Sequence, residues 1–191
     1  VLPFCGCASQ NKDSGPRIVS TEEMKDPLEA FPAPYSASDS PFGGSSSSRS
    51  MRGSVPADWY PPRSIERHWQ SIVIHHSATP NGNMAIFDKW HREGNHWDGV
   101  GYDFVIGNGT DSPDGLVEVT FRWHQQITGA HCKTPGNWAN ENAVGICLVG
   151  NFDESLPSDA QMQSLAQLVK YLAGRYRIPA HLIYGHNSTP G

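Results

Sequence analysis

The sequence predicts an α/β domain with a central mixed, mostly buried β-sheet flanked by helices and preceded by a disordered tether. Two observations lead to this fold class. Short apolar runs rich in β-branched residues alternate with helical patterns in the second part of the chain. All nine histidines lie at or after His68 and all six tryptophans at or after Trp59, so the composition changes near residue 60. We therefore expect the chemistry in the region after residue 60.

Four segments have the pattern of strands. Residues 71–76 form a short apolar run bounded by polar residues, which is typical of a buried strand. Residues 102–106 form a second run that ends at a Gly-Asn-Gly turn. Residues 116–121 alternate between apolar and polar side chains, and residues 143–149 are apolar on both faces. The last of these runs predicts a strand that is buried on both faces.

Two segments have the pattern of helices. Apolar residues recur at helical spacing over residues 84–92. The stronger signal lies at 159–176, because Ser158 and Gln161 have the spacing of a capping box and Pro179 marks the end. The predicted buried stripe of this helix consists of Met162, Leu165, Ala166, Val169, Leu172, Ala173 and Tyr176.

The first sixty residues have a different character. Residues 8–60 are rich in Ser, Pro and Gly and predict a disordered linker, because so few apolar side chains cannot offset the entropy of ordering. Residues 1–7 form an apolar run that ends in Gly-Cys and resembles the end of a bacterial lipoprotein signal peptide, in which Cys7 would be lipidated. An ordinary signal-peptide remnant and a chance apolar start are the alternatives. We expect an exported protein of the periplasm or cell envelope, with a lipid anchor if Cys7 is modified.

Composition excludes several classes of protein. The net charge of −5 argues against a nucleic-acid partner, because too few cations would neutralise a phosphate backbone. No apolar run reaches the roughly 18 residues that predict a membrane span. Four cysteines are too few for a disulfide-dense small protein. In an exported protein Cys132 and Cys147 either pair or remain free thiols.

Histidines stand at the ends of two apolar runs. His75 and His76 end the first predicted strand, and His186 follows a short apolar run at 182–185. Histidines held by separate rigid elements can form an open zinc site with a position left for water. Adjacent strand residues point to opposite faces, so only one of His75 and His76 is a candidate ligand. The alternative is that these are buried histidines whose rings bind backbone groups.

Several motifs occur in order along residues 68–191, and together they resemble the type-2 N-acetylmuramoyl-L-alanine amidases. That family includes phage lysozyme-type amidases and the peptidoglycan recognition proteins. The motifs are Val-Ile-His-His-Ser-Ala-Thr at 73–79, Trp-His at 90–91, Val-Gly-Tyr-Asp-Phe-Val-Ile at 100–106, Gly-Ala-His at 129–131, the run at 142–152 and Tyr-Gly-His-Asn at 184–187. We assign residues 61–191 to this domain.

The resemblance implies a role for four residues. His75 and His186 would be zinc ligands, while the third ligand, a Cys or Asp in the family, would lie beyond Gly191. Either the domain continues past Gly191 or the zinc site is incomplete. Tyr102 would be catalytic, orienting water or stabilising the tetrahedral intermediate. His131 would bind substrate in the groove or support the site from behind.

The expected function is therefore that of a monomeric, zinc-dependent N-acetylmuramoyl-L-alanine amidase. It would hydrolyse the amide between N-acetylmuramic acid and L-alanine, with peptidoglycan or a muropeptide as its partner. The alternative is a non-catalytic peptidoglycan-binding recognition module. A zinc peptidase of the stem peptide is disfavoured: His91 and Asp98 have the spacing of its His-x6-Asp ligand pair, but the surrounding strand pattern is missing.

Overall fold

The computed structural model of the protein describes residues 55–190. The expected lipidation site at Cys7 and most of the expected linker at 8–60 lie outside these residues. A five-stranded sheet forms the centre of the described part, in the order β3-β2-β4-β1-β5. Its strands are β1 (Ser71–His76), β2 (Phe104–Ile106), β3 (Val117–Val119), β4 (Ala143–Leu148) and β5 (Ile183–Gly185). Only β3 runs antiparallel to its neighbour, which confirms the predicted mixed sheet.

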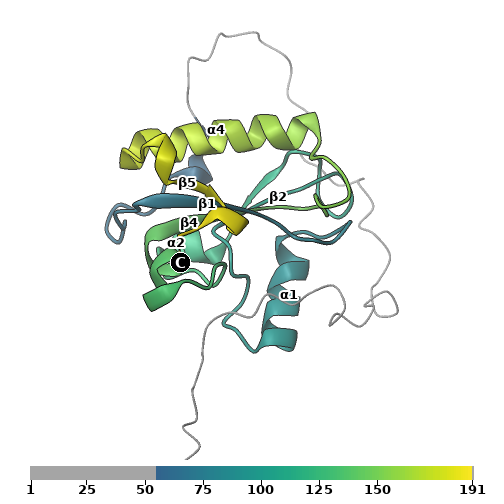
Figure 1. The fold of residues 1–191 in the computed structure, drawn as a ribbon, viewed down its shortest axis with the longest axis horizontal. Coiled ribbons are helices and arrows are strands. Elements are labelled where there is room, and N and C mark those ends of the chain that lie inside the picture. The colour runs from purple at the N-terminus through teal and green to yellow at the C-terminus, as the bar shows by residue number, and fades with distance from the viewer. Residues whose placement is uncertain (1–54, 191) are drawn as a thin grey trace, which may run out of the picture.

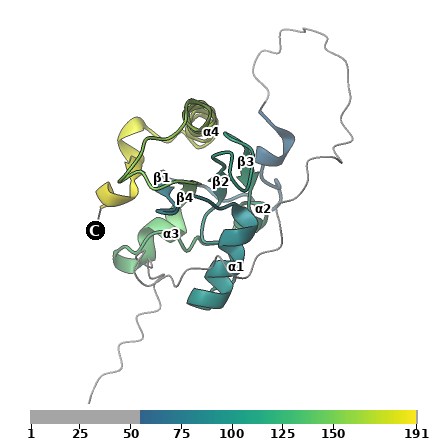
Figure 2. The same ribbon diagram turned by 90° about the vertical axis from the view of Figure 1, so that its right-hand side faces the viewer.

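Helices cover both faces of this sheet. They are α1 (Met84–Asn95), α2 (Phe121–Gln125), α3 (Trp138–Asn142) and α4 (Asp159–Tyr176), with short 3-10 turns η1 (Ala57–Trp59), η2 (Pro135–Asn137), η3 (Ala180–Leu182) and η4 (His186–Ser188). Figures 1 and 2 show α4 along one face and α1 and α3 on the opposite side. Strand β4 is the middle strand of the sheet, and all six of its residues are buried, as its apolar sequence predicts. None of the helices within residues 55–190 has the length and apolar character needed to cross a membrane.

The long helix α4 begins where the sequence predicts, but it buries a different row of side chains. Both hydrogen bonds of the capping box between Ser158 and Gln161 are present. Gln161 is itself buried, and its Nε2 donates to the carbonyl oxygens of Val149 and Ile106 at 2.9 and 3.3 Å. This contact sets the rotation of the helix, and the buried row is Gln161, Leu165, Leu168, Leu172 and Tyr176. The predicted stripe was therefore wrong at Met162 and Ala166, which are exposed, and it omitted Leu168.

The segment predicted as a strand at 116–121 divides into two elements. Strand β3 ends at Val119, and Thr120 begins helix α2 by accepting a hydrogen bond from the Arg122 backbone N–H at 3.2 Å. Phe121 is therefore helical, and the sequence pattern predicted neither α2 nor α3. Trp59 is 3% exposed and belongs to the core, so the packed region begins before residue 61.

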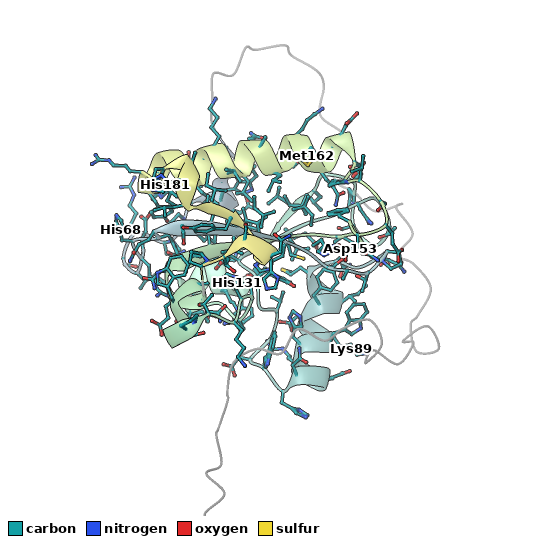
Figure 3. The ribbon with its side chains drawn as sticks, in the orientation of Figure 1. His68, Lys89, His131, Asp153, Met162 and His181 are labelled. Carbon is teal, nitrogen blue, oxygen red and sulfur yellow. The ribbon has the colours of Figure 1, made fainter. Side chains whose placement is uncertain are left out.

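The core divides between the two faces of the sheet. Ile72 and Ile146 pack with α4 on one face. Val105 and Cys147 pack with Phe87 of α1 on the other face. Side chains alternate along a strand, so His75 shares a face with its in-register neighbour Cys147 and points away from α4. In Figure 3, His131 lies on this same side of the sheet, opposite Met162 of α4.

Candidate active site

The candidate site lies where the parallel strands reach their carboxyl ends. His75 is in register with Cys147 of β4, and Cys147 is in register with Val105 of β2. On the other side of β1, Ile74 pairs with the last residue of β5. His186 follows directly, so it lies level with His75. Four strands, β2, β4, β1 and β5, therefore place these side chains in one row across the sheet.

Three of the predicted site residues, His131, His186 and Tyr102, meet around the fourth, His75. Its Nε2 lies 3.0 Å from Nδ1 of His131. The centroid of its ring lies 4.9 Å from that of His186 and 5.3 Å from that of Tyr102. His76 is separate, because its Nδ1 accepts a hydrogen bond from the Phe152 backbone N–H at 2.9 Å and its ring stacks on Phe152. His75 is therefore the member of the pair that faces the cluster.

The ring of His131 is enclosed behind His75 and is only 4% exposed. Its Nε2 donates to the carbonyl oxygen of Ala143 at 3.3 Å. Gly129 and Gly145 leave the space that the ring occupies, because a Cβ at either position would overlap His131 Cδ2. His131 is therefore placed to hold the ring of His75 in position. Its direct contact with substrate stays a prediction.

The backbone that carries His131 is held by a buried asparagine. Asn140 Oδ1 accepts hydrogen bonds from the backbone N–H groups of His131 and Cys132 at 2.7 and 3.0 Å. The amide nitrogen of Asn140 donates to Asn137 Oδ1 at 2.7 Å, which fixes its orientation. Helix α3 thus anchors the segment on which His131 lies.

Tyr102 lies between two histidine rings. Its ring centroid is 5.3 Å from that of His75 and 5.8 Å from that of His91. Its carbonyl oxygen accepts a hydrogen bond from Thr120 Oγ1 at 2.7 Å. Burial raises the pKa of the phenol well above its usual value, and the adjacent Cys147 thiol raises it further. The hydroxyl therefore stays protonated at neutral pH and can act as a hydrogen-bond donor.

Hydrogen bonds also fix the position of His186. It begins the short turn η4, and its carbonyl oxygen accepts from Thr189 Oγ1 at 2.9 Å. Thr189 Oγ1 lies 3.5 Å from Cys132 Sγ, which connects this turn to the segment that carries His131. Cys132 and Cys147 are both buried free thiols, so they do not pair with each other.

Burial sets the charge state of the cluster. It lowers the pKa of His75 well below its usual value, and the neighbouring histidines lower it further. Burial likewise lowers the pKa of His131 to about 4 and lowers that of His186. Burial also raises the pKa of the Cys147 thiol to about 12. At neutral pH the site thus holds neutral imidazoles, the form that binds metal ions.

The donor set fits zinc in part. Imidazole nitrogen is a common zinc ligand, and His75 and His186 are adjacent, neutral and held by separate elements. His75 also has the supporting hydrogen bond that metal-binding histidines usually make. Within residues 55–190, however, no group of three or more His, Cys, Asp or Glu side chains is arranged to hold a metal ion.

The sequence did not reveal two side chains, Asp103 and His91, that bind the backbone next to the cluster. Asp103 is fully buried, and its Oδ2 accepts from the Gly145 backbone N–H at 2.8 Å. His91 Nδ1 accepts from the Gly101 backbone N–H at 3.0 Å, directly before Tyr102. One signal was available in the sequence. A glycine inside a buried strand, as at Gly145, often marks a close approach by another group.

Comparison with known proteins adds to this geometry. Residues 65–191 match the family model Amidase_2, described as N-acetylmuramoyl-L-alanine amidase. The endolysin of Escherichia phage T7 is 36% identical over 114 residues, which cover 56% of this chain and 68% of the endolysin. An N-acetylmuramoyl-L-alanine amidase of Sus scrofa is 27% identical over 137 residues, 65% of this chain but only 21% of the pig protein.

A solved structure shows the same fold. The endolysin amidase LysCS from Clostridium intestinale superposes with a TM-score of 0.54 at 30% sequence identity, over 64% of this chain and 72% of LysCS. The match agrees with the central mixed sheet and flanking helices described above.

Proposed function

The chain belongs to the family of N-acetylmuramoyl-L-alanine amidases that it matches over residues 65–191, and from this premise we propose that it is a zinc-dependent peptidoglycan amidase. Its substrate would be the amide bond between the lactyl group of N-acetylmuramic acid and L-alanine of the stem peptide. The observation that carries the proposal is the meeting of His75, His186 and Tyr102 at one edge of the sheet.

Two residues would hold the metal. His75 ends strand β1 and His186 follows strand β5, so both imidazoles come from rigid, neighbouring elements. A bound zinc ion supplies Lewis-acid chemistry, which polarises a carbonyl group and makes a water molecule nucleophilic near neutral pH. His131 would keep the ring of His75 in place while substrate binds and leaves.

Tyr102 would act on the charge that develops during hydrolysis. Attack on an amide carbonyl converts its oxygen into an oxyanion, which a fixed hydrogen-bond donor stabilises. The phenol is half-buried beside His75 and remains protonated, so its hydroxyl is available as a donor. The hydrogen bond from Thr120 to the Tyr102 carbonyl holds this residue in position.

Mass spectrometry of digested peptidoglycan tests the proposal. Purified sacculi are incubated with the zinc-loaded protein, and we expect release of free stem peptides that begin at L-alanine. A chelator should abolish the release and added zinc should restore it. His75→Ala and His186→Ala should be inactive, whereas His181→Ala, at an exposed position outside the cluster, should be active.

A binding function is the other candidate, because residues 55–190 supply only two of the expected metal ligands. Sedimentation of the protein with insoluble sacculi separates the two functions. Retention on sacculi without release of any stem peptide would contradict the amidase proposal and favour a recognition module.

The proposal extends to the cell envelope. Peptidoglycan lies outside the cytoplasm, and the Gly-Cys sequence at residues 6–7 has the form of a lipid attachment site. We propose that lipid on Cys7 tethers the domain to a membrane. Mass spectrometry of the N-terminal peptide from the native host should show a diacylglycerol adduct. An unmodified thiol at Cys7 would contradict this part of the proposal.

A further inference from the structure

We propose that His131 is a positioning residue that fixes the tautomer of His75, with the proton on Nε2 and the lone pair on Nδ1. The lone pair of Nδ1 is then the one available for a metal ion. The metal role of Nδ1 rests on the proposed function. The tautomer itself rests on the hydrogen bonds and the burial described below.

The first step concerns the far side of His131. Its Nε2 lies 3.3 Å from the carbonyl oxygen of Ala143 in strand β4. A backbone carbonyl can only accept a hydrogen bond, so the proton of this contact must lie on His131 Nε2. The ring is 4% exposed, and no carboxylate within residues 55–190 forms a hydrogen bond with it. A buried imidazole in such surroundings is neutral, which leaves His131 Nδ1 with a lone pair.

The second step determines which atom donates in the hydrogen bond between His131 and His75. His131 Nδ1 lies 3.0 Å from His75 Nε2, a normal hydrogen-bond distance. Because His131 Nδ1 can only accept, His75 Nε2 must donate. A neutral imidazole carries a single ring proton, so Nδ1 of His75 keeps its lone pair. Within the described residues, Nδ1 of His75 makes no hydrogen bond that competes for it.

The third step concerns the orientation of the His131 ring. Gly129 and Gly145 lie against its Cδ2, with no room there even for a methyl group. Asn140 holds the backbone of His131 from below. A ring flip would replace both nitrogens with C–H groups and would break both hydrogen bonds at once. The orientation of the His131 ring is therefore fixed by its hydrogen bonds to Ala143 and His75, within a space that the two glycines enclose.

Metal-binding histidines usually make a hydrogen bond through the ring nitrogen that does not bind the metal, and His75 makes such a bond. One ring nitrogen of the ligand donates to a protein group, and this fixes which nitrogen faces the metal. Here the acceptor is a second histidine, and a main-chain carbonyl sets its own tautomer in turn. Without His131, His75 could adopt either tautomer, and only one of them would present Nδ1 as a ligand.

Nuclear magnetic resonance of the metal-free protein tests the proposal directly. In 15N-histidine-labelled protein, long-range 1H–15N spectra distinguish a protonated ring nitrogen from one with a lone pair. We expect His75 to be protonated at Nε2 and His131 at Nε2, with a scalar coupling across the bond from His75 Nε2 to His131 Nδ1. A His75 ring protonated at Nδ1 would overturn the proposal without any variant being made.

Two matched variants separate positioning from packing. His131→Asn keeps an acceptor near Nδ1, whereas His131→Leu has nearly the same shape and no acceptor. We expect His75 to populate both tautomers in His131→Leu, and zinc affinity to fall about 10- to 100-fold. His131→Asn should restore most of the His75 signature. An unchanged His75 spectrum in His131→Leu would overturn the proposal.

These readouts are independent of catalysis. His124→Asn, at an exposed position on α2, is the control and should leave the His75 signals unchanged. If the predicted tautomer is found but no amidase activity is detected, the role of His131 stands and the proposed function fails. If amidase activity is present but His75 has the opposite tautomer, the proposed function stands and the role of His131 fails.

Discussion

Gly145 lies directly against the imidazole ring of His131, so that a Cβ on this glycine would overlap ring atom Cδ2. The glycine belongs to the central strand β4, two residues before Cys147 and on the same face of the sheet. The absence of its side chain gives the ring the space to reach His75. A position inside the core thus determines the geometry at the edge of the sheet.

Replacement of this glycine should disturb both stability and the site. We expect Gly145→Ala to lower the free energy of unfolding by about 1–3 kcal/mol, because the added methyl group overpacks an enclosed ring. It should also weaken the bond between His75 and His131. Urea denaturation measures the first effect, and the His75 imidazole spectrum measures the second.

The matched control is Gly174→Ala. Gly174 lies at an exposed position of helix α4, where an added Cβ would have no atom within 4 Å. Alanine should stabilise this helix by about 0.5–1 kcal/mol. Equal stability changes in the two variants would contradict the packing argument.

Removal of the Tyr102 hydroxyl should affect the reaction more than the fold. We expect Tyr102→Phe to lower kcat about 10²- to 10³-fold, because a donor to the oxyanion is lost. Zinc content and the free energy of unfolding should change little. Tyr171→Phe is a suitable control, because its hydroxyl donates to the Trp59 carbonyl at 3.1 Å, far from the cluster. Wild-type turnover in Tyr102→Phe would exclude the assigned role.

Asp103 should make stability fall as pH rises. Burial raises its pKa from 3.8 to about 7 in the folded chain, although the hydrogen bond from Gly145 opposes this shift. Between about pH 4 and pH 7 the folded state therefore binds more protons than the unfolded state. The free energy of unfolding should decrease through this interval by up to roughly 1.4 kcal/mol per pH unit.

Asp103→Asn isolates this contribution. The amide oxygen can still accept from the Gly145 N–H, but the side chain no longer titrates. Denaturation curves for both proteins from pH 4 to pH 8 give a difference in stability that should favour the variant increasingly as pH rises. A difference that is independent of pH would show that the Asp103 pKa is not raised.

His91 should have the opposite effect. Burial and the nearby charge of Arg122 together lower its pKa from 6.5 to about 4. The unfolded chain then binds more protons than the folded chain between about pH 4 and pH 6.5, so stability should fall as pH drops through this range. Titration of the His91 ring by NMR should show a midpoint near pH 4. A midpoint near 6.5 would refute the expected burial effect.

The sequence predicted the central elements of the fold because their patterns are local. Strands β1 and β4 are uninterrupted apolar runs, and the capping box of α4 lies within four residues. Helix α2 was missed because residues 116–121 alternate without a break, and only the capping hydrogen bond of Thr120 shows where the strand ends. The rotation of α4 depends on the contact from Gln161 to strand β4, which periodicity cannot reveal.

The site was predictable to a similar degree. His75, His131, His186 and Tyr102 were named from motifs, and the structure brings them together. The contacts that hold the cluster join residues far apart in the chain, as His131 to Ala143 and Asp103 to Gly145 do. Such pairs depend on the packing of helices and loops on the sheet, for which the sequence carries no local signal.

The strand order also determines when the site can form during synthesis. Strand β1 carries His75 but pairs only with β4 and β5, which are made much later. A growing chain must therefore close long loops before either neighbour of β1 is present, which slows folding. His75 and His186 come together only after residue 186 has left the ribosome. The nascent domain thus cannot assemble this imidazole pair before almost all of residues 55–190 have been translated.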